Sequence, residues 1–224
     1  MIIWGFRRDL DIEPPRLVPT HSREALLRDQ FINCHYWERH GIEAFDHLTK
    51  KDKPLLEKLR KDMTLLEFDT LLPWRTVRDV IGDLPPPVNR GQEELFPNHI
   101  QHPGARVYPN HIGSFYDYPA KALKAGTHGT PGGENMLRSR NGEVRYFTTR
   151  EAARIQTFPD KWIFHGAWGS CIRQMGNAVP VEIGRLLGKT MARYLKDVRQ
   201  PRPLRSRAVE QTIIMIDKAG LYLS

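Results

Sequence analysis

The sequence contains only two cysteines, Cys34 and Cys171, among its 224 residues. Two cysteines are too few for a disulfide scaffold or a thiolate zinc cluster, so both classes are excluded. No run of about 18 apolar residues occurs, which excludes a transmembrane helix. In the first ten residues the apolar stretch precedes Arg7 and Arg8, the reverse of the order in a signal peptide, so we expect a cytoplasmic protein.

The usual catalytic and metal-binding signatures are also missing. The sequence has no Gly-rich phosphate loop, no His-Glu-x-x-His and no Cys-x-x-Cys. His99, His102 and His111 share one region, but no carboxylate or thiolate lies at the spacing of metal ligands. His35 and His40 lie five residues apart, not the four that place two side chains on one helix face. We therefore predict no metal site.

Positive charge exceeds negative charge. Lys and Arg together number 34 and Asp and Glu 26, which gives a net charge of +8 and an isoelectric point near 9.6. The chain is long enough to bury a core. A basic chain of this size most simply binds a polyanion, and nucleic acid is the leading candidate.

Local patterns predict several short elements in the first part of the chain. The apolar run Ile2–Phe6 predicts a buried strand, and the prolines of residues 11–20 predict a loop. Ser22 is expected to open a helix in which Leu26, Leu27, Gln30, Phe31 and Cys34 fall at helical spacing. Further helical pieces are predicted at Pro54–Met63 and Thr76–Gly82.

Residues 82–133 form a compositionally distinct region, because 16 of these 52 residues are Gly or Pro. An average chain has about 12% of these two residues, so we predict short strands and turns rather than long elements. Asn141-Gly142 then predicts a hairpin turn and Val144–Thr148 a strand. Thr148 and Glu151 form a capping-box pattern for a helix that extends to about Gln156.

A long helix is predicted from about Pro180, which suits a first-turn position. Its apolar stripe comprises Ile183, Leu186, Leu187, Thr190, Met191 and Tyr194. A basic stripe on another face comprises Arg185, Lys189, Arg193 and Lys196, and we interpret it as a solvated surface. The Arg- and Pro-rich stretch 199–207 is expected to be extended, and Ile213–Ile216 to form a strand or short helix.

Two strings in the second half resemble a known family. Residues 146–160 read YFTTREAARIQTFPD and resemble motif IX of the DNA cytosine-5 methyltransferases. Residues 174–180 read QMGNAVP and resemble motif X, in the family's order and followed by a helix. Residues 2–10 (IIWGFRRDL) are similar to the strand after motif VIII. Residues 121–133 (KALKAGTHGTPGG) resemble the DNA-reading edge of the target-recognition domain, where Ala122-Leu123 replaces the usual Thr-Leu pair.

The resemblance implies an α+β fold with a loop-rich, small-stranded target-recognition domain. The N-terminal strand and the C-terminal helix would complete a partner's Rossmann-like, S-adenosyl-L-methionine (AdoMet)-dependent α/β domain. The expected divisions are 1–20 as a docking strand and linker, 21–175 as the recognition domain with motif IX, 176–198 as motif X with its helix, and 199–224 as a basic extension.

The family's catalytic elements are not found in this sequence. The nucleophile of the family lies in Pro-Cys-Gln, but Asn33 precedes Cys34 and Ser170 precedes Cys171. The Phe-x-Gly-x-Gly loop for AdoMet and the Gln-x-Arg-x-Arg of motif VIII are absent as well. Residues 134–136 (ENM) imitate the catalytic Glu-Asn-Val but lie on the wrong side of the expected order.

These features resemble the smaller (beta) subunit of a naturally split bacterial cytosine-5 methyltransferase. Such a subunit would be inactive alone and would hold no catalytic residue. Its partners would be a catalytic (alpha) subunit with the Pro-Cys-Gln motif and double-stranded DNA, from which the target cytosine is flipped out. A restriction-modification role in the bacterial nucleoid and no association with a membrane are expected.

The resemblance also assigns roles to individual residues. The AdoMet-contacting residues would be Asn177, Ala178 and Val179. The DNA-contacting residues would be Lys121, Leu123, Lys124, Thr127, His128, Arg138 and Arg140. The residues with a structural role would be Arg150, Glu151, Gln174 and Gly176.

Three other functions fit the sequence less well. A non-catalytic DNA-binding module would have no need of an intact Gly-Asn-Ala-Val string. An amino-methyltransferase needs an Asp/Asn/Ser-Pro-Pro-Tyr/Phe motif, which Asp83-Leu84-Pro85-Pro86 does not match. A restriction endonuclease would show an Asp…Glu-x-Lys pattern, and none is convincing here.

Overall fold

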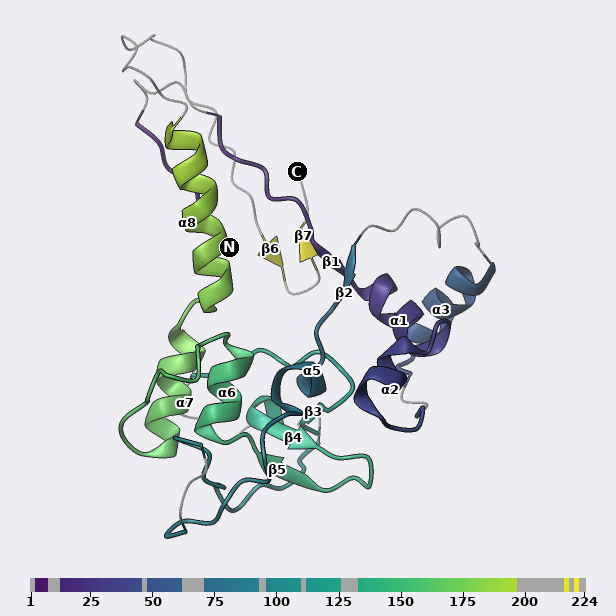
Figure 1. Cartoon of the computed structure of the whole chain (residues 1–224), viewed down its shortest axis with the longest axis vertical. Helices are drawn as coiled ribbons and strands as arrows, with labels where there is room; N and C mark the ends of the chain where they lie inside the picture. The colour runs from purple at the N-terminus through teal and green to yellow at the C-terminus, as the bar shows by residue number, and fades with distance from the viewer. Residues whose placement is uncertain are drawn as a thin grey trace. The chain divides into compact units, whose positions relative to one another are not determined.

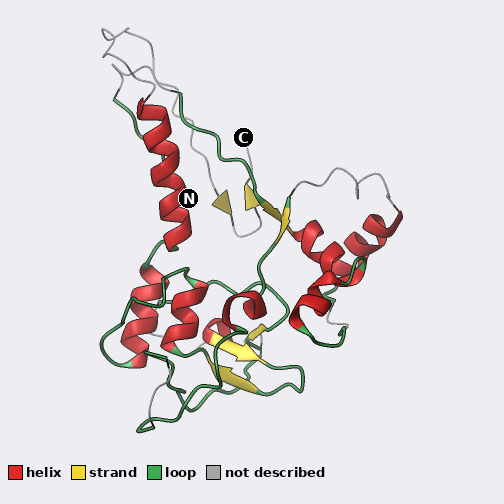
Figure 2. Ribbon diagram, in the orientation of Figure 1, coloured by secondary structure: helices red, strands yellow, loops and turns green. Residues whose placement is uncertain are grey.

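The computed structural model divides the chain into two units, each described here by itself (Figure 1). One unit comprises Pro19–Val181, and the other comprises Met1–Val18 with Glu182–Ser224. The described residues are 3–7, 13–45, 48–61, 71–92, 96–109, 112–125, 133–196, 216–217 and 220–221. Helices and short strands are mixed along the chain, which confirms the α+β fold class (Figure 2).

The first part of the larger unit contains three helices: α1 (Arg23–Phe31), α2 (His35–His40) and α3 (Asp52–Lys61). We call them the three-helix lobe. Strand β1 (His21–Ser22) enters it and pairs in parallel with β2 (Leu72–Pro73). The Ser22 side chain accepts a hydrogen bond from the backbone N–H of Ala25 and begins α1, as predicted.

The apolar cluster of the three-helix lobe is small. Its buried members are Leu26, Tyr36 and Trp37, with Phe31 and Ile42 packed against them. Ala25, Leu27, Leu56 and Leu59 of the lobe are buried as well, and polar contacts connect the lobe to the rest of the unit.

The rest of the larger unit, which we call the mixed core, has helices α5 (Val77–Ile81), α6 (Thr149–Ile155) and α7 (Trp168–Asn177). It also contains the short 3₁₀ helix η2 (Gly133–Asn135) and strands β3 (Ser114–Phe115), β4 (Met136–Arg138) and β5 (Val144–Tyr146). The strand order is β3-β4-β5, with β3 parallel and β5 antiparallel to β4.

The mixed core is held by a larger apolar cluster. Helices α6 and α7 lie side by side over it (Figure 1). Its fully buried members include Phe147, Ala152, Ile172 and Met175. Two local predictions from the sequence are confirmed. Gly142 adopts φ +91° in the β4–β5 turn, and Thr148 and Glu151 form the capping box of α6.

The smaller unit contributes α8 (Val181–Lys196), whose first residue belongs to the larger unit, and the antiparallel strands β6 (Ile216–Asp217) and β7 (Gly220–Leu221). The long helix predicted after Pro180 is confirmed. Ile183, Leu186 and Leu195 on it are exposed. No helix among the described residues is long and apolar enough to cross a membrane.

Several predicted elements require correction. Residues 3–7 belong to no helix or strand, because the described part of the chain offers no neighbouring strand for them. The first helix ends at Phe31, and Cys34 caps α2 in the left-handed region at φ 61°. The strand predicted for Val144–Thr148 ends at Tyr146.

Helix α7 was not predicted at all. Its sequence begins Trp-Gly-Ser and contains another glycine, so helix propensity is weak and packing decides the conformation. As a result, the first four residues of the motif X string, 174–177, are helical. Of the remaining expectations, Thr127, His128, Met63, the stretch 199–207 and residues 213–215 lie outside the described residues.

Candidate functional site

Arg150, the arginine of the motif IX string, lies inside the mixed core with no exposed surface. Its Nε donates to the carbonyl of Pro97 and one Nη to that of Trp162, both at 2.9 Å. Its backbone N–H donates to the carbonyl of Asn98 at 2.9 Å. Burial lowers the pKa of the guanidinium. One side chain thus joins α6 to two loops that are distant in the sequence.

Glu151, the next residue, anchors the start of α6. Both its carboxylate oxygens accept hydrogen bonds from Arg145 at 2.6 Å. One of them also accepts the backbone N–H of Thr148 at 2.8 Å. Because Glu151 is buried, this bidentate pair is shielded from water and fixes the helix against β5.

The motif X string forms the last turn of α7 and the residues after it. Met175 is fully buried, whereas Gln174, Asn177 and Val179 are exposed, Val179 by 63%. The Gln156 side chain donates to the carbonyl of Met175 at 2.8 Å. The C-terminal end of α7 is therefore fixed, and it presents Asn177 and Val179 at an open edge.

Gly176 allows a close approach between α7 and residues 124–125. A Cβ atom at this position would lie 2.8 Å from the backbone nitrogen of Ala125 and 3.0 Å from its Cβ. These distances are shorter than real Cβ contacts, so any side chain at this position would force the backbone to shift. Packing therefore requires glycine here.

The segment 121–125 is anchored on both sides by hydrogen bonds. The Lys121 N–H donates to the Ser114 hydroxyl at 3.1 Å. The side chain of Asn135 accepts the N–H of Lys124 at 3.2 Å and donates to its carbonyl at 3.3 Å. The Glu-Asn-Met string at 134–136 thus has a structural use here, since Asn135 is fully buried in this role.

The side chains of this segment point to different environments. Lys121 and Lys124 are exposed, and the Lys124 ammonium lies 2.8 Å from a carboxylate oxygen of Glu134. Leu123 is buried in the apolar cluster of the mixed core. The burial of Leu123 fixes the segment that carries the two lysines, and its assignment to the DNA-contacting residues stays a prediction.

Arg138 and Arg140 flank the β4–β5 turn. The Arg138 guanidinium stacks over the Phe115 ring, 5.3 Å from its centroid. Arg140 donates to the carboxylate of Asp117 at 3.4 Å and to the carbonyl of Glu43 at 3.1 Å. Arg140 is therefore engaged within the protein, whereas Arg138 keeps its charge half-buried at the surface.

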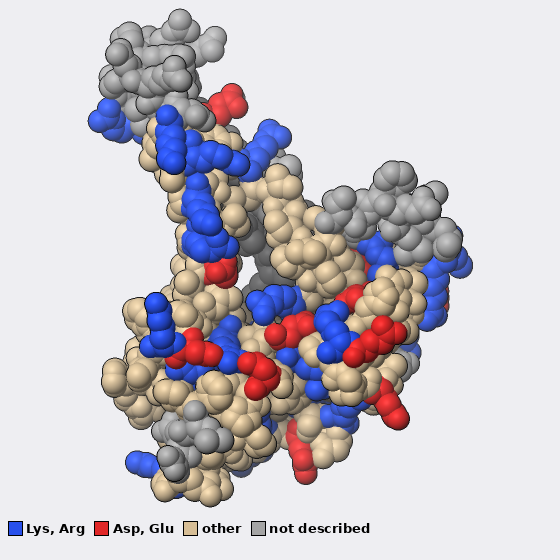
Figure 3. Space-filling view, viewed as in Figure 1, with Lys and Arg blue, Asp and Glu red and all other residues tan. Residues whose placement is uncertain are grey.

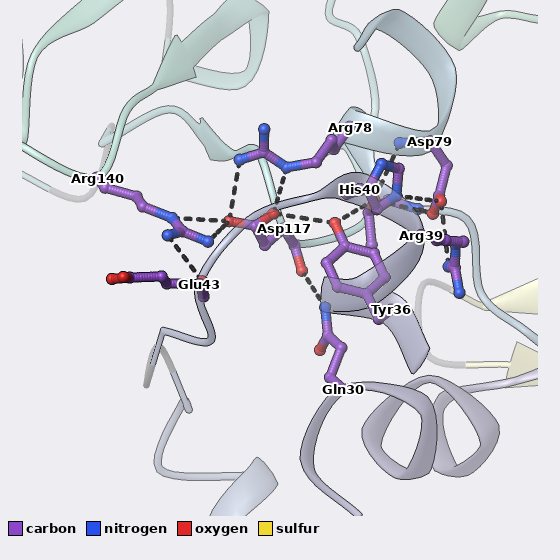
Figure 4. Close-up of polar contacts among 10 residues, drawn as sticks. Gln30, Tyr36, Arg39, His40, Glu43, Arg78, Asp79, Asp117 and Arg140 are labelled. Atoms are coloured by element: carbon purple, nitrogen blue, oxygen red, sulfur yellow. Dashed lines mark hydrogen bonds and ion pairs between the residues drawn. The ribbon is translucent and has the colours of Figure 1, made fainter. Parts of the chain in front are cut away.

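Asp117 is the centre of a polar network that joins the mixed core to the three-helix lobe (Figure 4). Its carboxylate accepts hydrogen bonds from Arg78 at 2.7 and 3.3 Å and from the Tyr36 hydroxyl at 3.0 Å. Its carbonyl accepts the Gln30 side chain at 2.8 Å. We call Asp117, Arg78, Arg140, Tyr36 and Gln30 the Asp117 network.

Burial alone would raise the pKa of the Asp117 carboxyl. The hydrogen bonds and the charge of Arg78 outweigh burial, and the pKa is lowered. The pKa of Tyr36 is raised, first by burial, so its hydroxyl stays protonated and donates. The network therefore holds one buried anion between two guanidiniums.

Two further carboxylates connect the same two regions. Asp52 of α3 is buried and bonded to Arg23, Thr49 and the hydroxyl of Tyr118. Asp79 of α5 lies 2.9 Å from His40 Nε2. In both, burial would raise the pKa, but the hydrogen bonds lower it. Burial and the bond to Asp52 raise the pKa of Tyr118 to about 12.

Of these junction residues only Arg140 was selected from the sequence, and it was selected as a DNA-contacting residue. Tyr116-Asp117-Tyr118 is an acid between two aromatic residues, a pattern with no specific meaning. Gln30 and Tyr36 are 87 and 81 residues away from Asp117, so only the tertiary structure brings them together.

The sequence of the chain was compared with known proteins. The pattern of the C-5 cytosine-specific DNA methylase family matches residues 42–193, about two thirds of the chain. The chain belongs to this family. The match includes α3 of the three-helix lobe, the mixed core and most of α8, whereas α1 and α2 precede it.

Individual DNA methylases align over shorter stretches. The type II methyltransferase M.Sau96I of Staphylococcus aureus is 46% identical over 66 residues, which are 30% of this chain and 15% of that protein. M.PspPI of Psychrobacter sp. is 48% identical over 66 residues, 30% of this chain and 16% of that protein. M.AplI of Arthrospira platensis is 32% identical over 146 residues, 62% of this chain and 41% of that protein.

The chain thus spans well under half of the length of these DNA methylases. Members of the family normally use AdoMet and act on DNA. Residues 177–179 fit a place beside such a cofactor in one respect: Asn177 offers an exposed amide and Val179 an exposed apolar surface. They form an open edge of α7 and do not enclose a ligand by themselves.

Proposed function

We propose that this chain is the DNA-recognition subunit of a two-subunit cytosine-5 DNA methyltransferase. It corresponds to the smaller subunit of a split enzyme, and a second chain with the Pro-Cys-Gln motif supplies the nucleophile and most of the AdoMet site. The names of the relatives as type II methyltransferases support a role in restriction-modification.

The proposal rests mainly on the environments of the two cysteines. Cys171 is buried, its Sγ lies 3.7 and 3.6 Å from the carbonyls of His165 and Gly166, and burial raises the pKa of its thiol. A thiol with a raised pKa is a poor source of the thiolate that must attack cytosine C6. Cys34 is exposed and precedes α2, with no proline before it. The nucleophile must therefore come from elsewhere.

DNA recognition is assigned to residues of the mixed core. Lys121, Lys124 and Arg138 would neutralise phosphates and set the register, and Thr127 and His128 would be further DNA contacts. Hydrogen bonds to Ser114 and Asn135 support this role, because they fix the backbone from which the lysines extend. Arg140 would act as a positioning residue through Asp117. The target cytosine would then be flipped out toward the partner.

The cofactor edge is assigned to the end of α7. AdoMet supplies the methyl group that is transferred to cytosine C5. Asn177, Ala178 and Val179 would form one wall of its site, and Gln174 and Gly176 would position that wall. We divide the chain accordingly into 1–20, 21–175, 176–198 and 199–224, and assign the first division and the helix after Pro180 to docking on the α/β domain of the partner.

Reconstitution tests the proposal. The chain alone should transfer no methyl group from AdoMet to duplex DNA, and addition of a chain with the Pro-Cys-Gln motif should restore transfer. Robust methylation by the isolated chain would refute the two-subunit assignment. Duplex binding without any restored transfer would instead support the alternative, a non-catalytic DNA-binding module.

A matched pair of variants tests the cofactor edge. Asn177→Ala should weaken AdoMet binding by the reconstituted enzyme, measured by calorimetry. Asn89→Ala removes an exposed amide from a loop that contains none of the assigned contacts, and it should leave binding unchanged. Equal effects of the two substitutions would remove Asn177 from the assigned contacts.

A further inference from the structure

We infer that the outer face of α3 is a second DNA-contacting surface, which binds the phosphate backbone without reading its sequence. This inference rests on the proposed function, since it places more of the same duplex on the larger unit. We call this surface the α3 basic face. Its members are Lys50, Lys51, Lys53, Lys58, Arg60 and Lys61.

All six cations of the α3 basic face are exposed, and Lys and Arg side chains lie over this helix in the space-filling view (Figure 3). In the part of the chain that the structure describes, none of the six forms an ion pair. The same stretch has two acidic residues, Asp52 and Glu57. Asp52 is buried and paired with Arg23, so within residues 50–61 only Glu57 offsets the exposed charge.

Helix stability does not explain this charge pattern. Cations in the last turn of a helix are favourable for its dipole, which accounts for Lys58, Arg60 and Lys61. Cations near the first turn are unfavourable for the same reason, yet Lys50, Lys51 and Lys53 lie there. A ligand with negative charge along the whole helix accounts for both ends.

The shape of α3 suits a phosphate backbone. Ten residues of helix extend over about 15 Å, and duplex DNA carries one charge per about 1.7 Å of its axis. The inner face of the helix packs Leu56 and Leu59, so the cations occupy the opposite half. Between them lies an open, shallow hollow lined by Pro54, Glu57, Lys58 and Lys61.

The lobe is attached to the segment that carries the proposed recognition lysines. Tyr118 donates to Asp52 at the start of α3, and Gln30 and Tyr36 bind Asp117. Asp117, Tyr118 and Lys121 belong to one described stretch, residues 112–125. Hydrogen bonds therefore fix α3 to the stretch that would hold the duplex. We expect the α3 basic face to contact phosphates of the same duplex outside the recognised sequence.

The slope of affinity against salt measures such contacts directly. We would titrate a 40-base-pair duplex of arbitrary sequence with the full chain, by fluorescence anisotropy at several salt concentrations. The triple substitution Lys53→Gln, Lys58→Gln and Lys61→Gln should reduce the slope of log K against log salt by about 0.9 for each phosphate that is no longer neutralised, about 2.7 in all. Glutamine keeps nearly the same helix propensity.

A matched triple controls for net charge. Arg90, Lys161 and Arg173 are exposed cations of the same unit, and their substitution by Gln removes the same charge elsewhere. It should change the slope by less than one. Equal slopes for the two triple variants would overturn the inference, because the effect would then come from net charge alone.

A substitution in the opposite direction guards against loss of folding. Glu57→Lys adds a cation to the α3 basic face and should tighten binding and steepen the slope by about 0.9. Unfolding of the lobe cannot produce tighter binding. Unchanged or weaker binding by this variant would contradict the inference.

The failure of the two proposals can be told apart. If the unaltered chain binds no duplex, both the DNA-recognition role and the α3 contact are wrong. If it binds but the α3 triple retains the full salt slope, only the α3 contact is wrong. Loss of association with the catalytic chain at unchanged DNA affinity would assign the face to an acidic protein surface and overturn the DNA contact.

Discussion

The mixed core and the three-helix lobe are stabilised by different means. The mixed core buries eleven apolar residues in one cluster, and its internal charges, Arg150 and Glu151, bond mainly to its own segments. The lobe has three buried apolar residues in its cluster and depends on Asp52, Asp79 and Asp117 at its junction with the core. Hydrophobic burial does not depend directly on pH, whereas buried ion pairs do, so the two regions should respond differently to acidification.

Acidification should separate the two regions most clearly. The folded-state pKa values of Asp52, Asp79 and Asp117 are lowered. A lowered folded pKa contributes stability that is present above the unfolded value, about 3.9, and is lost as the pH falls through the folded value. Because three carboxylates act together, the lobe should lose protection from hydrogen exchange below about pH 4 while α6 and α7 retain it. Simultaneous loss in both regions would show that they unfold as one.

A single substitution at the junction should have the next largest effect. Asp117→Ala leaves Arg78 and Arg140 without their buried anion and should lower the free energy of unfolding by about 3–5 kcal/mol, as for other buried pairs that lose one partner. Urea denaturation measures the change. Asp83→Ala is the control, because Asp83 pairs with Arg154 while its side chain is 70% exposed. It should cost under about 1 kcal/mol.

A methyl group added at Gly176, where α7 packs closely against residues 124–125, should lower the free energy of unfolding by less than Asp117→Ala does. Gly176→Ala places a Cβ against the backbone of Ala125 and should destabilise the chain by about 1–3 kcal/mol, as overpacked sites do. Gly188→Ala in α8 meets no atom within 4 Å and should be neutral or stabilising by up to about 1 kcal/mol. Equal thermal denaturation midpoints for the two variants would mean that α7 can move away from residues 124–125 at no cost.

Substitutions at the two helix caps should have the smallest effect on stability, and they form a closely matched pair. Thr148→Ala and Thr76→Ala each remove a capping box and should cost about 0.5–2 kcal/mol. The Thr76 hydroxyl also bonds to Tyr36 of the lobe at 2.9 Å, whereas the Thr148 hydroxyl bonds to His99 at 2.9 Å within the core. Hydrogen exchange should therefore show loosening of α2 in the Thr76 variant only. Loosening of α2 in both would indicate that the lobe has no separate stability.

Several elements of the mixed core and of the smaller unit could be predicted from local patterns. The Thr148 capping box, the Asn141-Gly142 turn and the helix after Pro180 depend on residues within a few positions of one another, and all three are present. The motif strings identified the family, which the match over residues 42–193 confirms. Assignment of Asn177 and the neighbouring residues to AdoMet stays a prediction.

Other features could not be predicted, because they depend on packing between segments that are distant in the sequence. Helix α7 has weak propensity and forms because Ile172 and Met175 fill the core, a contribution that no short window contains. The burial of Leu123, which the sequence placed near DNA, depends on the same packing.

The sequence by itself determined the family, the positions of the caps and turns, the excess of positive charge and the lack of a usable Pro-Cys nucleophile. Each of these is a property of composition or of neighbouring residues. Only the tertiary structure decided which charges are neutralised. Asp117 lies between Arg78 and Arg140 because β4–β5 and α5 meet there, whereas the cations of α3 have no described ion-pair partner. Ion pairs at long sequence separation depend on the path of the whole chain, which local preferences do not specify.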